Sequence, residues 1–261
     1  MFKNRRSSSL KNFLCRKEPK IVLAGMHKSG TTAVAKILGA TINRDVSSDP
    51  LHQINLIDVN ARIRLEKREI SFHQLVKSHP QFFRSIVIKD PHFPMMLTDL
   101  RSVFPNMKIV SIIRDPRDTI RSILNRLNLP GDPSKVTLDQ LDLPFGWKSL
   151  LKGEYPDIAG DDYIEVLANR WAMIAEIISN NQDTSVLIRY EEFNRNKKEV
   201  IDELAIKLGY EKLRSAKSIQ DVQFQPKGNS KVTWVDFYAV RQLDKINSIC
   251  ASMMEEFGYE K

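Results

Sequence analysis

Short apolar runs alternate with amphipathic stretches along most of this 261-residue chain. Runs rich in Val, Ile and Leu are typical of buried strands, and they lie at residues 20–25, 85–91, 107–116 and 184–193. Apolar residues recur at helical spacing in 31–40, 163–178, 197–210 and 237–257, and a further helix is expected to begin at Pro116, capped by Asp115. Strands that alternate with helices predict an α/β fold, a three-layer sandwich with a central parallel sheet.

The chain is expected to form one domain over residues 20–261, since its length supports a sizeable core and no internal repeat divides it. Residues 128–161, with prolines at 130, 133, 144 and 156, are expected to form a long irregular insertion. The two cysteines, Cys15 and Cys250, are too few for a disulfide framework or a metal cluster, which fits a reducing compartment.

The positive charge of the chain is concentrated at its beginning. Residues 1–20 hold seven basic residues and one acid, so they carry +6 of the net charge of +8 and the remaining 241 residues carry +2. The body therefore lacks the charge of a nucleic-acid-binding surface. Residues 1–19 are expected to be a disordered leader, with a transit peptide or peripheral contact to an acidic membrane as the alternatives. This leader has no apolar stretch long enough for a signal peptide or a transmembrane segment.

The segment GMHKSGTT, residues 25–32, lies between a predicted strand and a predicted helix, where phosphate-binding loops occur. Gly25 and Gly30 have the spacing of a nucleotide-triphosphate loop, but Thr31 stands where that loop has its lysine. Lys28 lies inside the loop instead. Backbone N–H groups, the dipole of the following helix, three hydroxyls and this lysine together predict an anion site. A lysine placed here can reach a bridging oxygen, where charge develops as a terminal group leaves.

This loop and two further motifs resemble those of sulfotransferases that use 3′-phosphoadenosine 5′-phosphosulfate (PAPS). KSGTT after an apolar strand is similar to the loop that holds the 5′-phosphosulfate in that family. IVSIIRDPRDTIRSIL, residues 109–124, resembles the segment whose arginine and serine hold the 3′-phosphate, here Arg114 and Ser122. VIKDP, residues 87–91, resembles a lysine-bearing strand end of carbohydrate and tyrosylprotein sulfotransferases. The donor-binding residues implied in the loop are His27, Lys28, Ser29, Gly30, Thr31 and Thr32.

The resemblance implies a P-loop nucleotide-hydrolase-like fold and a role for the matched lysines and arginine. Lys28 would neutralise the leaving phosphate, and Lys89 would stabilise the sulfuryl group in transfer. Arg114 follows an apolar strand and so falls at the carboxyl edge of the sheet, where open α/β sheets bind ligands. The structural alternatives are a salt bridge from Arg114 to Asp118 and one from Lys89 to Asp90.

Five further residues are weighed against plain structural roles. Ser122 lies nearly opposite the apolar stripe of its helix, so the helical pattern alone predicts an exposed serine. Lys227 and Gly228 loosely resemble a late, basic, glycine-containing loop that closes over the 3′-phosphate in the family, and a solvated turn is the alternative. Trp171 is expected in the core because of its helical spacing, whereas Trp147, in the insertion, is the candidate for an acceptor contact.

The group that takes the proton from the acceptor hydroxyl is left open among three residues. Histidine or a carboxylate can take this proton as the sulfuryl group arrives. His52 is the first candidate, since it falls near a position that is often glutamate in relatives, and Asp49 is the second. His92 is the third, since cytosolic relatives place a histidine just after the residue that corresponds to Lys89. The alternative is that all three are surface polar groups.

The resemblance thus implies an enzyme that transfers the sulfuryl group of PAPS to a hydroxyl, without a metal ion. A carbohydrate or glycolipid acceptor is expected from the VIKDP motif, with residues 41–84 and 128–161 shaping its site. The resemblance also implies a cytoplasmic enzyme with a small-molecule or glycan acceptor and no nucleic-acid partner. Two other classes remain as alternatives, namely an ATP-dependent kinase with a degenerate loop and a non-catalytic nucleotide-binding module.

Overall fold

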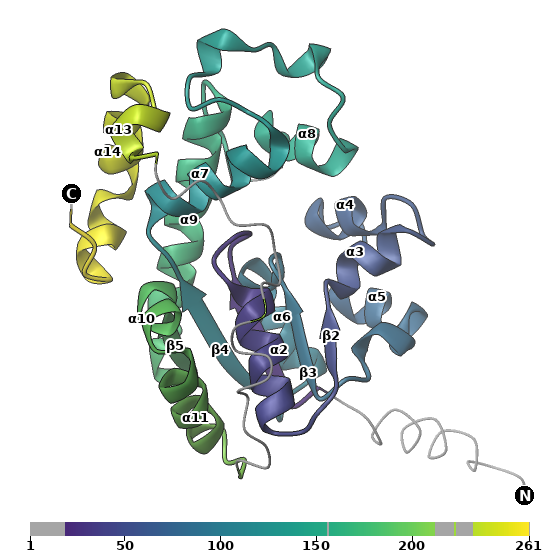
Figure 1. Cartoon of the computed structure of the whole chain (residues 1–261). Helices are drawn as coiled ribbons and strands as arrows, with labels where there is room; N and C mark the ends of the chain where they lie inside the picture. Colours follow the sequence, from purple (N-terminus) through teal and green to yellow (C-terminus); the bar gives the residue numbers. More distant parts are fainter. Residues whose placement is uncertain (1–18, 156, 212–221, 223–231, 261) are drawn as a thin grey trace, which may run out of the picture.

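The computed structural model describes residues 19–155, 157–211, 222 and 232–260, and strands and helices alternate along them (Figure 1). The strands are β1 (Ile21–Gly25), β2 (Val46–Ser48), β3 (Val87–Asp90), β4 (Lys108–Ile113) and β5 (Ser185–Arg189). The earlier helices are α2 (Thr31–Thr41), α3 (Pro50–Asn55), α4 (Ala61–Glu66), α5 (Phe72–Ser78), α6 (Leu97–Val103) and α7 (Pro116–Leu127). The later helices are α8 (Phe145–Leu151), α9 (Tyr163–Ser179), α10 (Tyr190–Arg195), α11 (Lys197–Lys207), α13 (Trp234–Phe237) and α14 (Val240–Glu256).

The strands of the described part form one parallel sheet in the order β2-β3-β1-β4-β5. Its central strand, β1, pairs with β3 on one side, where Leu23 lies opposite Lys89. On the other side it pairs with β4, where Gly25 lies opposite Ile112. The strands that follow β1 in the chain lie on both of its sides, first β2 and β3 and then β4 and β5. Ligands of open α/β sheets bind where the strand order switches sides in this way, outside the carboxyl ends of the strands. The loop after β1 and the ends of β3 and β4 meet there.

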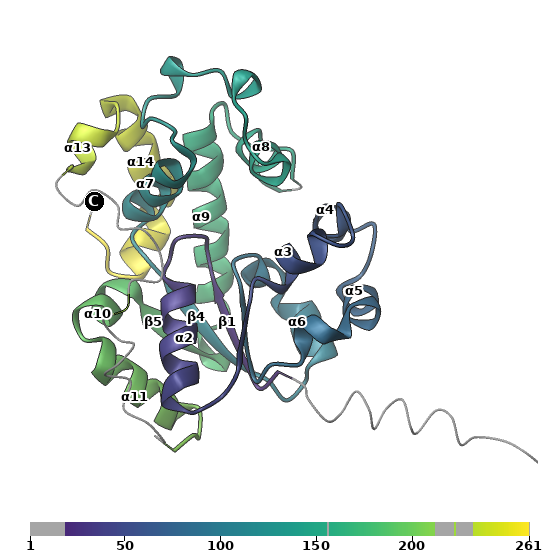
Figure 2. The same cartoon turned by 45° about the vertical axis from the view of Figure 1, so that its right-hand side comes forward.

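Side chains of the central strand alternate between the two faces of the sheet, and both faces are covered by helices. Ile21 and Leu23 pack with residues of α2 and α11, whereas Val22 and Ala24 pack with residues of α3 to α6. A third apolar cluster joins α7, α8, α9 and α14, which lie beside the sheet in Figure 2. Trp171 belongs to this cluster and is 1% exposed, as its helical spacing predicts. The three-layer parallel α/β fold is therefore confirmed.

The fourth strand is shorter than predicted, because its second half is helical. Strand β5 ends at Arg189, and residues 190–193 of the predicted strand belong to α10. Tyr190 and Phe193 are three residues apart, a spacing that places both on one side of a helix. Phe193 is buried against the α2 face of the sheet. The aromatic residues that extended the predicted strand are thus the packing face of a short helix.

The last predicted helix, 237–257, is interrupted near its start, and α13 and α14 form separate helices. Tyr238 between them is extended, with φ −93° and ψ 144°. Its hydroxyl donates a hydrogen bond of 2.7 Å to the backbone oxygen of Arg117, and its backbone forms a bridge with Gly131. These tertiary contacts hold Tyr238 out of a helix that the apolar spacing alone would continue.

The region predicted as an irregular insertion contains a helix. α8 (Phe145–Leu151) forms in the stretch between Pro144 and the next proline, and it buries Leu150 and Leu151. Residues 41–84, for which the sequence pattern assigns no element, hold β2 and the short helices α3, α4 and α5. Within the described residues, no helix combines the length and apolar character that crossing a membrane requires.

Candidate active site

The loop between β1 and α2 has the backbone of an anion-binding turn. Both the N–H and the hydroxyl of Ser29 donate to the backbone oxygen of Met26, at 3.1 and 2.7 Å. Lys28 and Gly30 have positive φ angles of 67° and 95°, and such a conformation is uncommon for a lysine. Gly30 is the N-cap of α2 and supplies no side chain to its first N–H groups. These N–H groups and the positive end of the helix dipole are therefore directed at the loop.

The two glycines of the loop are required by close neighbours. A Cβ atom on Gly25 would lie 2.7 Å from the backbone oxygen of Ile112, on the neighbouring strand. A Cβ atom on Gly30 would lie 2.4 Å from Cδ2 of Tyr190, at the start of α10. The loop is thus pressed against both β4 and the segment after β5.

Positive charge gathers around Lys28. Burial lowers the pKa of Lys28, and the positive charges of Arg114 and Arg126 lower the pKa further. The guanidinium of Arg114 donates a hydrogen bond of 2.8 Å to the backbone oxygen of Lys28. It also lies over the ring of Tyr190, 4.5 Å from its centroid. A bound anion would relieve the repulsion among these three cations.

The structure rejects the salt bridge considered for Arg114. Asp118 pairs instead with Arg121, at 2.7 Å. The Nε atom of Arg114 is buried, and within the described part of the chain it has no hydrogen-bond partner. Ser122, on α7, is half-buried, in contrast to the exposed position that the helical pattern predicts. Arg114 thus retains one donor atom for a ligand.

Lys89, at the end of β3, pairs with Asp49 rather than with Asp90. Its Nζ atom lies 2.8 and 3.0 Å from the two carboxylate oxygens of Asp49, and Lys89 is 3% exposed. The carboxylate of Asp90 is turned away and accepts hydrogen bonds from the backbone of Leu51 and His92. Burial raises the pKa of this Asp90 carboxyl group. The salt bridge considered between Lys89 and Asp90 is therefore wrong, and Asp49 is the partner of Lys89.

The backbone of Asp49 holds its carboxylate at this lysine. Asp49 is the N-cap of α3, yet its side chain makes no capping hydrogen bond, although aspartate is a favoured capping residue. Its φ and ψ angles of 54° and 53° are left-handed, and its N–H donates to the backbone oxygen of Lys89 at 2.8 Å. A left-handed conformation in a residue other than glycine is costly and is often found at functional sites.

The two histidine candidates for the base lie in different surroundings. His52 is exposed on α3. His92 is buried, and its Nδ1 atom lies 2.6 Å from Oε1 of Glu66 and 3.4 Å from Nη2 of Arg170. These two contacts hold the ring of His92 between α4 and α9. Its ring also meets the ring of His27, with the centroids 4.9 Å apart.

Polar residues that are buried or partly buried surround His92, and apart from His27 the sequence pattern does not single out these neighbours. We call this group the charged cluster, and its members are His27, Arg62, Glu66, His92, Tyr155 and Arg170. Burial and the charges of His92 and Arg170 hold the pKa of His27 well below its ordinary value. Burial and the charge of Glu66 raise the pKa of Tyr155 to about 12. The cluster begins at the loop between β1 and α2 and extends to α4, α9 and the insertion.

The pKa of Glu66 makes the charged cluster sensitive to acid. Burial alone would raise this pKa, but His92, Arg170 and Arg62 lower it from about 4.5 to about 2. A carboxyl whose pKa is lowered on folding stabilises the protein above its unfolded pKa, and the stabilisation is lost as pH falls through the folded pKa. We expect Glu66→Gln to cost about 3 kcal/mol of unfolding free energy near neutral pH, and the cost to shrink between pH 4.5 and 2.

Urea unfolding of both proteins at several pH values measures this difference. Glu69→Gln, which removes an exposed carboxylate three residues later, is the control and should leave stability nearly unchanged at every pH. A cost of Glu66→Gln that stayed constant across the acid range would contradict the electrostatic origin of the effect.

Other predicted site residues are placed only in part. Lys227 and Gly228 lie outside the described residues, as does the basic leader up to residue 18. Trp147 is half-buried, and its ring lies 4.8 Å from the ring of His27. The part of the chain that the structure describes holds no group of three or more His, Cys, Asp or Glu side chains arranged for a metal ion.

The fold and motifs agree with what comparison with known proteins finds. A sulfotransferase from Alicyclobacillus acidocaldarius is 15% identical, with a TM-score of 0.54 over 94% of this chain and 97% of that chain. Sulfotransferase STF9 from Mycobacterium avium is 12% identical, with a TM-score of 0.59 over 97% of this chain and 81% of that chain. A mouse sulfotransferase complexed with PAP is 14% identical, with a TM-score of 0.50 over 97% of this chain and 91% of that chain. At these identities the likeness shows the fold. No curated protein sequence matches the chain. The family profile described as sulfotransferase domain matches residues 18–245, and the chain therefore belongs to the sulfotransferase family.

Proposed function

We propose that this sulfotransferase takes the sulfuryl group from PAPS and transfers it to a hydroxyl of a carbohydrate or glycolipid. The donor assignment rests on the contact between the two segments that resemble donor-binding motifs. Arg114 is 86 positions from Lys28 in the sequence, yet it donates a hydrogen bond of 2.8 Å to the backbone oxygen of Lys28. A similar mouse structure was solved with PAP, which supports the same donor here. The VIKDP motif supports the acceptor class.

The donor would bind across the loop and the end of β4. The backbone N–H groups of the loop, the hydroxyls of Thr31 and Thr32, and Lys28 would hold the 5′-phosphosulfate. Arg114 and Ser122 would hold the 3′-phosphate, and the buried Nε atom of Arg114 supports this, since a phosphate oxygen would supply its missing partner.

The reaction needs one bond to break, one to form and one proton to move. The bond between sulfur and the oxygen of the 5′-phosphate breaks, and a bond forms between sulfur and the acceptor oxygen. Lys28 would neutralise the charge that develops on the leaving phosphate oxygen, and Lys89 that on the sulfuryl oxygens. The proton of the acceptor hydroxyl passes to a base on the protein.

Among the candidate bases we favour Asp49. Its carboxylate lies within 3.0 Å of Nζ of Lys89, which would place the base and the sulfuryl-binding lysine at one point. The side chain of Asp49 is partly exposed, with 38% of its surface accessible, so an acceptor can reach it. His52, which is exposed in α3 three residues after Asp49, is the second candidate. His92 is the third, and its Nδ1 atom is paired with Glu66.

The donor assignment predicts a preference for the 3′-phosphate. We expect calorimetric titration without Mg²⁺ to show that 3′,5′-adenosine bisphosphate binds at least about tenfold more tightly than ADP, since a charge-assisted pair contributes roughly 1.5–3 kcal/mol. Arg114→Ala should abolish the preference. Ser122→Ala, which leaves the packing of the arginine on Tyr190 in place, should weaken it less.

Equal affinity for both nucleotides would contradict the donor assignment and favour an ATP-dependent kinase with a degenerate loop. Tight binding of the bisphosphate without transfer from PAPS to any acceptor would favour a nucleotide-binding module. Arg195→Ala, at an exposed position on α10, is the control for a general loss of positive charge.

A further inference from the structure

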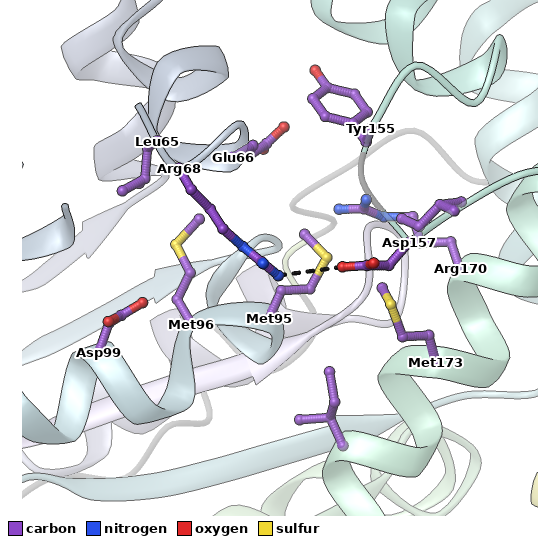
Figure 3. Close-up of a pocket in the computed structure, with 12 residues that line it drawn as sticks. Leu65, Glu66, Arg68, Met95, Met96, Asp99, Tyr155, Asp157, Arg170 and Met173 are labelled. Carbon is purple, nitrogen blue, oxygen red and sulfur yellow. Dashed lines mark hydrogen bonds and ion pairs between the residues drawn. The ribbon is translucent and has the colours of Figure 1, made fainter. Parts of the chain in front are cut away.

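The charged cluster opens onto a pocket that the donor does not need. The pocket has a volume of about 240 Å³, and three of its lining residues, Glu66, Tyr155 and Arg170, belong to the cluster (Figure 3). The pocket is smaller than the ~300–1,000 Å³ typical of small-molecule sites, so it suits part of a ligand rather than a whole one. Through His92 and His27 the cluster also reaches the loop that holds Lys28. The lining also draws on residues 41–84 and 128–161, the two segments expected to shape the acceptor site, so the pocket is on the acceptor side of the proposed site.

The charges of the cluster are not balanced. Two guanidinium groups, those of Arg62 and Arg170, accompany one carboxylate, that of Glu66. Arg170 is fully buried, and removal from water is costly for a charge without a full set of partners. Two aspartates also line the pocket, but Asp157 is held by Arg68 at 3.3 Å and Asp99 is exposed. An excess of positive charge thus remains at the buried end.

Several polar atoms of the cluster also lack partners. The Nε atoms of Arg62 and Arg170 are buried donors without a hydrogen-bond acceptor among the residues described. Oε2 of Glu66 is a buried acceptor without a hydrogen-bond donor in the same part of the chain. Buried polar groups are nearly always hydrogen-bonded, so unpaired donors beside an unpaired acceptor indicate a site for a polar ligand. A carboxylate satisfies the donors, and a hydroxyl satisfies the carboxylate oxygen.

A small residue makes room for one of the arginines. A Cβ atom on Gly146, in α8, would lie 1.8 Å from Nη2 of Arg62. The guanidinium group of α4 therefore occupies space that only glycine leaves open in the insertion. The next residue, Trp147, presents an aromatic ring beside His27, and such a ring offers a flat apolar surface to one side of a ligand.

Resting on the proposed function, we propose that the pocket and the adjoining charged cluster receive a carboxylate of a hydroxylated acceptor. Arg170, which lines the pocket, and Arg62, whose Nε atom lies 3.8 Å from Oε1 of the lining residue Glu66, would bind it. The acceptor class is then a sugar acid, or a glycan that contains one, rather than a neutral sugar or an apolar alcohol. Glu66 would accept a hydrogen bond from a hydroxyl of the same sugar. The carboxylate would supply the negative charge that the buried arginines lack.

Two probes that differ at one carbon test the proposal. The protein is saturated with 3′,5′-adenosine bisphosphate and titrated with 4-nitrophenyl β-D-glucuronide, which has a carboxylate, or with the matching glucoside, which has a hydroxymethyl group. We expect the glucuronide to bind about tenfold more tightly, the change that corresponds to about 1.4 kcal/mol. Arg62→Gln should abolish this preference. Lys67→Gln removes one positive charge from an exposed side chain five residues later and should leave the preference intact.

Gly146→Ala provides a second variant that keeps both arginines, and it should also reduce the preference by displacing Arg62. Equal binding of the two glycosides, or binding of neither, would overturn the proposal. Either result can occur while 3′,5′-adenosine bisphosphate still binds more tightly than ADP. A failure of the proposed function is different, because the bisphosphate would then bind no more tightly than ADP. A preference that survives Arg62→Gln would also overturn the role of this arginine.

Discussion

Replacing Lys28 with methionine is expected to lower kcat for transfer from PAPS by about 10²–10³-fold, the usual effect of removing one group that stabilises developing charge. The side chain lies in a loop pressed between β4 and Tyr190, and Arg114 binds the backbone oxygen of the same residue. Methionine keeps most of the length of the side chain, one heavy atom short of lysine, and leaves this backbone contact possible. The loss should therefore come from the missing positive charge.

The charge of Lys28 should matter more to the reaction than to binding. The phosphate oxygen gains negative charge only as the bond to sulfur breaks, and only interactions that strengthen in the transition state raise kcat. We therefore expect calorimetry to show a much smaller loss in affinity for 3′,5′-adenosine bisphosphate than the loss in kcat. Lys207→Met, at an exposed position of α11, is the control. Equal losses in affinity and in kcat would mean that Lys28 binds the donor uniformly and does not assist its cleavage.

The meeting of the two proposed donor-binding segments could be predicted because their residues follow strand ends at fixed spacing. The loop at 25–32 and Arg114 each come directly after an apolar strand, and parallel strands bring their carboxyl ends to one edge. The order of the strands is not contained in either motif, so their contact at 2.8 Å is known only from the structure. The neighbouring Tyr190 was missed, because an aromatic residue directly after a strand resembles its continuation.

The charged cluster could not be predicted in the same way. Glu66, His92 and Arg170 come from three separate segments with no common motif, and only the tertiary fold brings them together. One signal was present: position 170 follows Leu167 by three residues and precedes Ile174 by four, so an arginine stands on the apolar face of the predicted helix. A buried arginine needs partners, and this position could have indicated a polar site within the core.

The contact between Lys89 and Asp49 predicts which residue acts as the base. Asp49→Asn is expected to lower kcat by about 10²–10⁴-fold, the range that general base catalysis contributes. Asparagine has the same shape but cannot take a proton from the acceptor hydroxyl. Radiolabelled PAPS with the 4-nitrophenyl glycosides as acceptors measures kcat of the unaltered enzyme and of the variant under the same conditions.

The variant His52→Ala tests whether His52, rather than Asp49, is the base. The histidine is three residues from Asp49 and exposed, so its loss should change kcat by less than about twofold. Because Asp49→Asn also leaves the buried ammonium of Lys89 without its carboxylate, thermal unfolding must show that the variant remains folded at the assay temperature. If His52→Ala lowered kcat by about 10²-fold or more and Asp49→Asn did not, the histidine would be the base. The carboxylate would then serve only to position Lys89 beside the sulfuryl group.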